Sequence, residues 1–314
     1  MLKLSEFIRG IYAPTYWYGL LSPKTIENYL ISVCRYIEIV GDLPLNEITP
    51  YHNARFVLGL KQFGQSLETE RKHCRHLNTI FLKMGPPGPR HRDSMHVIPV
   101  APWIRPPQPF RKLPREIGDS IADSLYNAVP LTPECFLYPT YLEAELRPNW
   151  WRAMITLITT SAIRLGVVFG LRWADLDIGQ KYFIVPAGID KKKAERRKPL
   201  HQEVLRLLES VRENEFLLSW SHGKKRFYEI WHRINEVGDI MPHITPHDLK
   251  RYSLQLASRS GVDVATLKQL GDHANIETTF NHYVPGNLER YIETVRLPGS
   301  GLKSAANESE VSHD

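Results

Sequence analysis

The chain has 314 residues, of which 42% are hydrophobic, a length and composition that suit two packed domains of a soluble protein. Lysine and arginine total 40 against 34 aspartate and glutamate residues, and the resulting charge of +6 is compatible with a polyanionic partner without requiring one. The three cysteines are scattered and include no C-x-x-C pair, which argues against a disulfide framework or a zinc site. No apolar run approaches the ~20 residues that span a bilayer, and the N-terminus does not resemble a signal peptide. We therefore expect a cytoplasmic protein with no membrane partner.

Apolar residues first recur at helical spacing in three stretches, which open at Ser22, Thr49 and Ser66. Each opening residue suits an N-cap, and the first two are followed by proline, which suits the first helical position. The third stretch carries a group of basic residues. A solvated charged face is the ordinary interpretation of such a group, and DNA contact is the alternative that the rest of the chain favours. The DNA-binding candidates here are Arg71, Lys72 and Arg75.

Composition divides the chain into four segments. Residues 1–84 are predicted to form a small helical domain. Nine of the chain's 23 prolines lie between residues 85 and 114, and proline at that density favours an extended linker. Helical patterns dominate again in residues 115–298, the second predicted domain. Residues 299–314 are small and polar, a composition typical of disordered tails.

Groups suited to phosphate chemistry first appear in two places in the second domain. Arg164 lies in an apolar context, where a guanidinium needs a carboxylate or a bound phosphate as its partner. Further along, residues 182–186 and 197–200 are typical of two short strands joined by a basic turn. Lys191 lies on that turn, where a lysine could reach a DNA groove and donate a proton, although a solvated charge run is the ordinary interpretation.

Two more groups follow nearer the C-terminus. A Thr-Pro pair opens a helix that places His247 and Lys250 one turn apart on one face, at a helix N-terminus that favours anions. Residues 270–284 then supply His273 and, ten residues later, Tyr283. Taken alone, such a histidine is usually a structural hydrogen-bonding group and such a tyrosine usually packs in a core.

The order of these groups resembles that of the tyrosine recombinase (phage integrase) family, and the resemblance covers roughly residues 20 to 295. It implies that a tyrosine attacks a DNA phosphodiester, forms a 3′-phosphotyrosine link and allows strands to be rejoined, with neither metal nor ATP as cofactor. Lys192, Lys193 and Arg251 lie beside the matching positions and are further DNA-binding candidates. The catalytic residues that the resemblance implies are Arg164, Lys191, His247, Lys250, His273 and Tyr283.

The same resemblance implies a mainly α fold with a small β-sheet (α+β). A helical, SAM-like core-binding domain and the catalytic domain would form a C-shaped clamp on double-stranded DNA. A homotetramer on two DNA sites is the expected assembly, with a monomer or weak oligomer when free. Leu288, Tyr291, Ile292 and Val295 predict a short helix with one apolar stripe, which would dock on a neighbouring protomer or fold back on its own domain.

The chain departs from the family pattern at four positions. Lys250 stands where the family has arginine, and lysine lacks the fork that grips two phosphate oxygens. Val167 replaces an acidic residue, Asp272 replaces a glycine, and His282 holds the usual place of the tyrosine. The alternative hypothesis is therefore a recombinase fold that binds DNA with impaired catalysis. A metal-dependent nuclease is disfavoured, since the sequence offers no carboxylate cluster.

Overall fold

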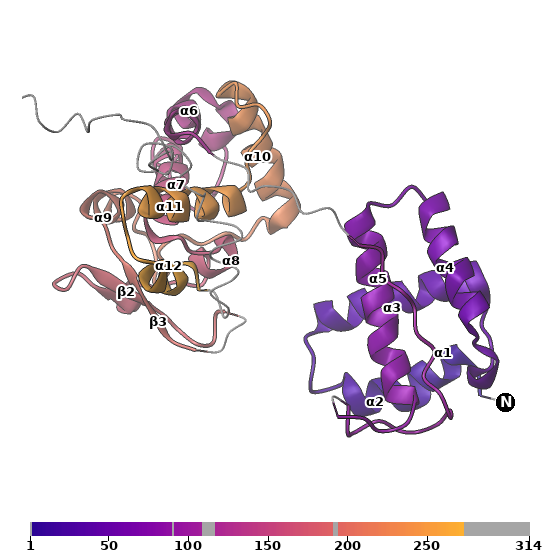
Figure 1. The fold of residues 1–314 in the computed structure, drawn as a ribbon. Coiled ribbons are helices and arrows are strands. Elements are labelled where there is room, and N and C mark those ends of the chain that lie inside the picture. Colours follow the sequence, from indigo (N-terminus) through magenta and orange to yellow (C-terminus); the bar gives the residue numbers. More distant parts are fainter. Residues whose placement is uncertain (1, 90, 109–116, 191–193, 273–314) are drawn as a thin grey trace, which may run out of the picture. The chain divides into compact units, whose positions relative to one another are not determined.

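The computed structural model describes residues 2–89, 91–108, 117–190 and 194–272, and it divides the chain into two compact units, 1–112 and 113–314. The boundary between the units falls inside the segment that the prolines predicted to be a linker. Helices dominate both units (Figure 1).

Unit 1 is a bundle of helices that begin where the sequence indicates. Ser22 accepts a hydrogen bond from the backbone N–H of Thr25 (3.2 Å) at the start of α3, and Gly41 ends that helix with a φ of 106°. Only glycine adopts such a backbone easily. The helical elements of unit 1 are α1 (Leu4–Phe7), η1 (Ile8–Tyr12), α2 (Ala13–Tyr16), α3 (Pro23–Val40), η2 (Leu45–Glu47), α4 (Pro50–Gln62) and α5 (Leu67–Met84).

Two parts of unit 1 differ from the expectation. The continuous helical segment from Leu4 to Tyr16 had no predicted counterpart, because the π-helix η1 in its middle interrupts the α-helical period. Packing holds this segment, with Phe7 and Trp17 almost wholly buried. The second difference concerns the predicted linker. Ile98 and Ile104 are buried in the core of unit 1, and the side chain of Asn78 makes hydrogen bonds to both backbone groups of Ile104 (2.7 and 2.8 Å). Residues up to Ile104 therefore pack with this unit.

Unit 2 is built around α7, whose Trp150, Trp151 and Ile158 are completely buried. Helices α9 and α11 pack against it. The helical elements of unit 2 are α6 (Asp119–Ala128), η3 (Val129–Leu131), η4 (Pro133–Phe136), α7 (Arg147–Ser161), α8 (Leu165–Val168), η5 (Trp173–Asp175), α9 (Gln202–Glu209), α10 (Gly223–Val237), α11 (Pro246–Arg259) and α12 (Val264–Gly271).

A small antiparallel sheet of three strands, β1 (Leu176–Asp177), β2 (Tyr182–Val185) and β3 (Arg196–Pro199), completes unit 2. The two predicted strands correspond to β2 and β3, and β1 is an addition too short to predict. Phe183 is paired with Lys198 across the sheet, and both side chains are buried. The expectation of a mainly α fold with a small sheet is confirmed.

Candidate active site

The N-terminal end of α11 forms as its Thr-Pro pair predicts. Thr245 is the N-cap, and its hydroxyl accepts a hydrogen bond from the backbone N–H of Asp248 (3.2 Å). The carboxylate of Asp248 in turn accepts from the backbone N–H of Thr245 (2.8 Å). This reciprocal capping fixes the start of the helix. It sets His247 at an exposed position on the first turn and Lys250 one turn later.

His247 and Lys250 do not present one common face to solvent, which differs from the expectation. The side chain of Lys250 is 1% exposed, and its Nζ donates hydrogen bonds to the carbonyl oxygens of Ala162 (2.7 Å) and Gly271 (2.9 Å). Burial lowers the pKa of Lys250 to about 7, and the nearby charge of Lys198 adds to this effect. The pKa of His247 is also lowered, first because the surrounding protein partly desolvates its ring and next by the charge of Arg251.

Arg164 lies just after a left-handed turn that ends α7. Ala162 adopts a φ of 52° there, so the chain changes direction and Arg164 becomes the N-cap residue of α8. The Arg164 side chain is 36% exposed. Its Nη1 lies 3.3 Å from Asp190 and 3.7 Å from Asp272. The partner that the sequence required for this arginine is therefore supplied by carboxylates in the described structure.

Sequence reasoning missed most of the cluster around Arg164. Asp272 was noted only as a departure, yet its carboxylate lies 2.9 Å from Arg196 Nε and 2.9 Å from Lys198 Nζ. Arg196 also pairs with Asp190. Strand alternation offered a signal, because residues 196 and 198 share one face of β3 and a lysine on a buried face requires a partner.

The cluster carries a surplus of positive charge. Its four basic side chains come from the start of α8, from β3 and from α11, whereas its carboxylates are Asp190 and Asp272. The surplus is two charges when both lysines are protonated, and it lies where Arg164 keeps partial access to solvent. Such a site attracts an anion, and an anion would raise the lowered pKa values of the buried lysines. The basic side chains are those of Arg164, Arg196, Lys198 and Lys250.

Several predicted site residues lie outside the described residues. The described residues end at Asp272, directly before His273, and residues 191–193 between β2 and β3 are not among them. The residues concerned are Lys191, Lys192, Lys193, His273 and Tyr283.

Three of the DNA-binding candidates that are described, Arg71, Arg75 and Arg251, form ion pairs within their own helices. Arg71 and Arg75 of α5 both lie near Glu68, at 3.9 and 3.7 Å. Lys72 is half-buried on the same helix of unit 1. Arg251 lies 3.6 Å from Asp248 and is 24% exposed. The pairs with Glu68, whose side chain is 64% exposed, are weak enough for a phosphate to compete with the carboxylate.

Tyr252 directly follows Arg251 on α11. Its hydroxyl donates a hydrogen bond to Asp119 (2.8 Å), and burial together with that carboxylate raises its pKa to about 12. A phenol in this setting is a poor source of phenolate, so Tyr252 is poorly suited to act as a nucleophile.

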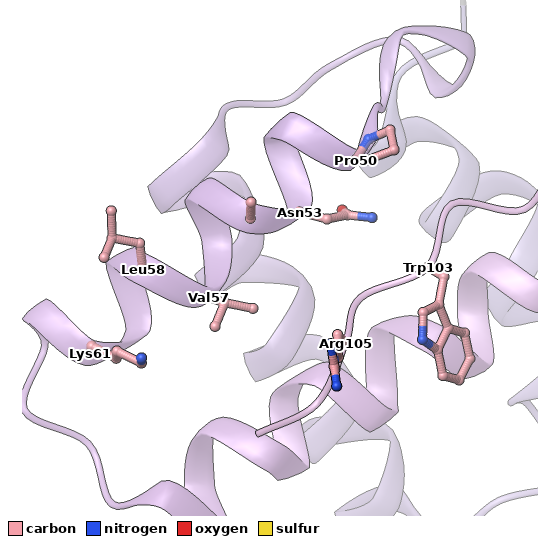
Figure 2. Close-up of a pocket in the computed structure, with 8 residues that line it drawn as sticks. Pro50, Asn53, Val57, Leu58, Lys61, Trp103 and Arg105 are labelled. Carbon is pink, nitrogen blue, oxygen red and sulfur yellow. The ribbon is translucent and has the colours of Figure 1, made fainter. Parts of the chain in front are cut away.

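A separate hollow of about 450 Å³ lies in unit 1, between α4 and the segment that follows α5 (Figure 2). Its charged lining residues are Lys61 and Arg105, and Trp103 also lines it. The groups suited to phosphate chemistry belong instead to unit 2. Among the residues described, no three histidine, cysteine or acidic side chains gather as metal ligands, and no helix is long and apolar enough to cross a membrane.

A sequence model of the phage integrase family matches residues 140–290, a range that includes the whole cluster and extends to His273 and Tyr283. This range is just under half of the chain. Together with the curated relatives described next, the match indicates a tyrosine-type site-specific recombinase. A tyrosine recombinase XerA from Thermococcus kodakarensis is 25% identical over 270 residues, which cover 82% of this chain and 83% of that protein. A tyrosine recombinase XerD from Oceanobacillus iheyensis is 22% identical over 289 residues, covering 86% and 91%.

Solved structures share the fold of this integrase-family chain. XerH recombinase bound to its difH substrate matches with a TM-score of 0.65 at 16% identity, covering 86% of this chain and 80% of that one. A lambda integrase dimer on a core site matches with a TM-score of 0.64 at 15% identity, covering 90% and 77%. The catalytic fold is therefore that of the recombinases, as the order of the four sequence groups predicted.

Proposed function

We propose that this recombinase cleaves DNA with Tyr283 as the nucleophile and with the cluster around Arg164 as the site of the scissile phosphate. The observation that carries this proposal is the surplus of positive charge that surrounds Asp272, because the chain leads directly from this residue to His273 and Tyr283. A phenol with a pKa of about 10 needs such a field to become a nucleophilic phenolate.

The reaction is a transesterification, in which Tyr283 loses its phenol proton to the proposed shuttle His247 as the phenolate forms. The phenolate oxygen of Tyr283 forms a bond to phosphorus as the bond to the 5′-oxygen breaks, giving a 3′-phosphotyrosine and a 5′-oxygen that must accept a proton. Lys191 is the proposed acid that supplies this proton, and His247 a proton shuttle or phosphate contact. A 5′-hydroxyl from another strand reverses the step and rejoins the DNA.

Cations stabilise the charge that builds on the non-bridging oxygens in the transition state. Arg164 is proposed to contact these oxygens directly, since its guanidinium is partly exposed. His273 is the proposed second contact. Lys250 acts through its charge and through the backbone that it holds, because its Nζ already binds two carbonyl oxygens and lysine lacks a bidentate fork.

Double-stranded DNA is the proposed partner, bound largely through phosphate contacts in both units. Solved relatives of the same fold include a lambda integrase tetramer on a Holliday junction, which supports oligomer formation on DNA. We propose a homotetramer on two sites, in which the stripe from Leu288 to Val295 docks on a neighbour. The cytoplasm is the proposed location.

The test of the proposed site compares Arg164→Ala with wild type on duplexes nicked near a randomised centre. Wild-type protein is first incubated with the randomised pool, and the duplexes that it traps as covalent adducts are sequenced and used as substrates. Arg164→Ala should cleave these duplexes roughly 100- to 1,000-fold more slowly, the usual loss for one preorganised donor, while binding changes only a few-fold. The matched control is Arg172→Ala, because Arg172 also pairs with a carboxylate, Glu215, at 2.9 Å and is 52% exposed.

Equal cleavage by Arg164→Ala and wild type would show that the cluster does not hold the phosphate. Wild-type protein that binds DNA but never forms an adduct would instead favour the alternative of impaired catalysis.

A further inference from the structure

Lys198 is a buried lysine for which the proposed chemistry has no direct role. Its side chain is 0% exposed on β3, and burial lowers its pKa. A lysine in such a position costs stability unless hydrogen bonds and an opposite charge compensate for it. The Nζ of Lys198 finds both, because it donates to the carbonyl oxygen of Leu270 and lies 2.9 Å from the carboxylate of Asp272.

Both partners of Lys198 belong to the C-terminal end of α12. The last carbonyl groups of a helix have no partner within the helix, and cationic side chains can satisfy them. Lys198 satisfies Leu270, and Lys250 satisfies Gly271 (2.9 Å) from α11. Two lysines from different elements therefore hold consecutive residues at this helix end, which lies beside β3 in Figure 1.

Asp272 completes the attachment in an unusual backbone conformation. Its φ is 58°, a left-handed value that aspartate tolerates better than most residues other than glycine and asparagine. Glycine would relieve this backbone at no steric cost, but it would leave Lys198 and Arg196 without the carboxylate that lies 2.9 Å from each of them. The acidic side chain thus has a use at this position that glycine lacks.

We propose that Lys198 and Asp272 are positioning residues, which tie β3 of the hairpin to the end of α12 and so fix the start of the segment that carries His273 and Tyr283. Strand β3 follows the turn that carries Lys191, and helix α12 precedes the segment that carries Tyr283. The contact holds these two elements in a fixed position relative to each other. The catalytic consequence of this inference rests on the proposed function. The tie itself, by which we mean the contacts of Lys198 with Leu270 and Asp272, is a property of the DNA-free protein.

Hydrogen exchange of the full-length, DNA-free protein tests the tie first. Lys198→Met keeps the length of the side chain and removes its charge, so exchange of the α12 amides should become at least about 10-fold faster through local opening. Exchange in α10, which packs on α6 and η4, should stay unchanged. Unaltered exchange at α12 would overturn the proposal, as would equal acceleration throughout unit 2.

Single-turnover cleavage tests the consequence. Lys198→Met and Asp272→Asn should each cleave at least about 10-fold more slowly at saturating DNA, with binding unchanged, since small misplacements of reacting groups have large kinetic effects. Lys198→Arg should recover part of the rate. The control is Ile234→Val, a truncation of a fully buried core residue on α10, which lowers stability without touching the cluster.

The double variant Lys198→Met/Asp272→Asn distinguishes a pair from two separate contributions. Each single substitution already removes the contact between Lys198 and Asp272, so the loss of cleavage rate in the double variant should be smaller than the product of the two single losses. Wild-type rates in all three variants would overturn the positioning role and leave the proposed phosphate site intact. A wild-type protein that forms no adduct would refute the proposed function, and the exchange experiment would still decide the tie.

Discussion

The Nζ of Lys250 donates a hydrogen bond to the carbonyl oxygen of Ala162 at 2.7 Å, joining the second turn of α11 to the turn that precedes Arg164. The same Nζ binds Gly271 at the end of α12. Lys250 therefore connects the two described segments that lead to the proposed phosphate contacts, Arg164 and His273. An arginine in this position would have more donors but also more bulk to bury.

Lys250→Ala should slow cleavage, because the transition state loses about 2–4 kcal/mol of stabilisation, the range for losing one preorganised donor. Lys250→Arg should retain cleavage or raise it, because it keeps a charge within reach of the same carbonyl groups. Single-turnover rates on the selected duplex measure both. An alanine variant as fast as wild type would move this role to Arg251.

Ala162→Gly should raise the free energy of unfolding by up to about 1 kcal/mol, because left-handed backbone costs an L-residue roughly 1–2 kcal/mol and glycine loses part of this in the unfolded chain. The φ of 52° at Ala162 is the basis. Ala153→Gly, in the middle of α7 and fully buried, is the matched control and should lower stability by about 1 kcal/mol. Urea unfolding compares the three proteins. Destabilisation by both substitutions would show that residue 162 bears no such strain.

The stability of unit 2 should depend on pH through Lys250. Its pKa is about 7 in the folded protein against 10.5 for a free lysine, so between these values the unfolded chain binds a proton that the folded chain lacks. The free energy of unfolding should therefore rise with pH across this window, by at most about 1.4 kcal/mol per unit. The lowered pKa of Lys198 acts in the same direction.

Lys250→Met should flatten that dependence between pH 7 and the alkaline end of the window, as measured by urea unfolding. Lys225→Met, at a side chain that is 94% exposed, should leave it unchanged. A slope that survives in Lys250→Met would assign the dependence to other groups.

DNA binding should weaken steeply as salt increases, because basic side chains displace condensed counterions from phosphates. Chelators should leave cleavage unchanged, since the proposed transesterification uses protein cations alone. Affinity measured over a salt series and cleavage measured with EDTA check the two expectations. Activity lost in EDTA and restored by Mg²⁺ would exclude the mechanism without a metal.

The sequence predicts the helices whose starts carry cap signals, such as those at Ser22 and Thr245, because capping is a local interaction. It also predicts the β2–β3 hairpin and the family. It did not predict that Lys250 faces inward, because helical spacing alone does not say which neighbour a side chain meets. Lys198 and Asp272 are 74 positions apart in the chain, and a pairing of that kind depends on tertiary structure.

The central claim is that Tyr283 becomes covalently bound to DNA, and peptide mapping of the trapped adduct tests it most directly. Trypsin should release residues 269–290, in which Tyr283 is the one tyrosine, while His273 and His282 are other possible acceptors. After nuclease digestion, fragmentation of this peptide by mass spectrometry should place the nucleotide on Tyr283. Tyr283→Phe should bind the same duplex and give no adduct. A nucleotide on any other residue, or an undiminished adduct with Tyr283→Phe, would contradict the account.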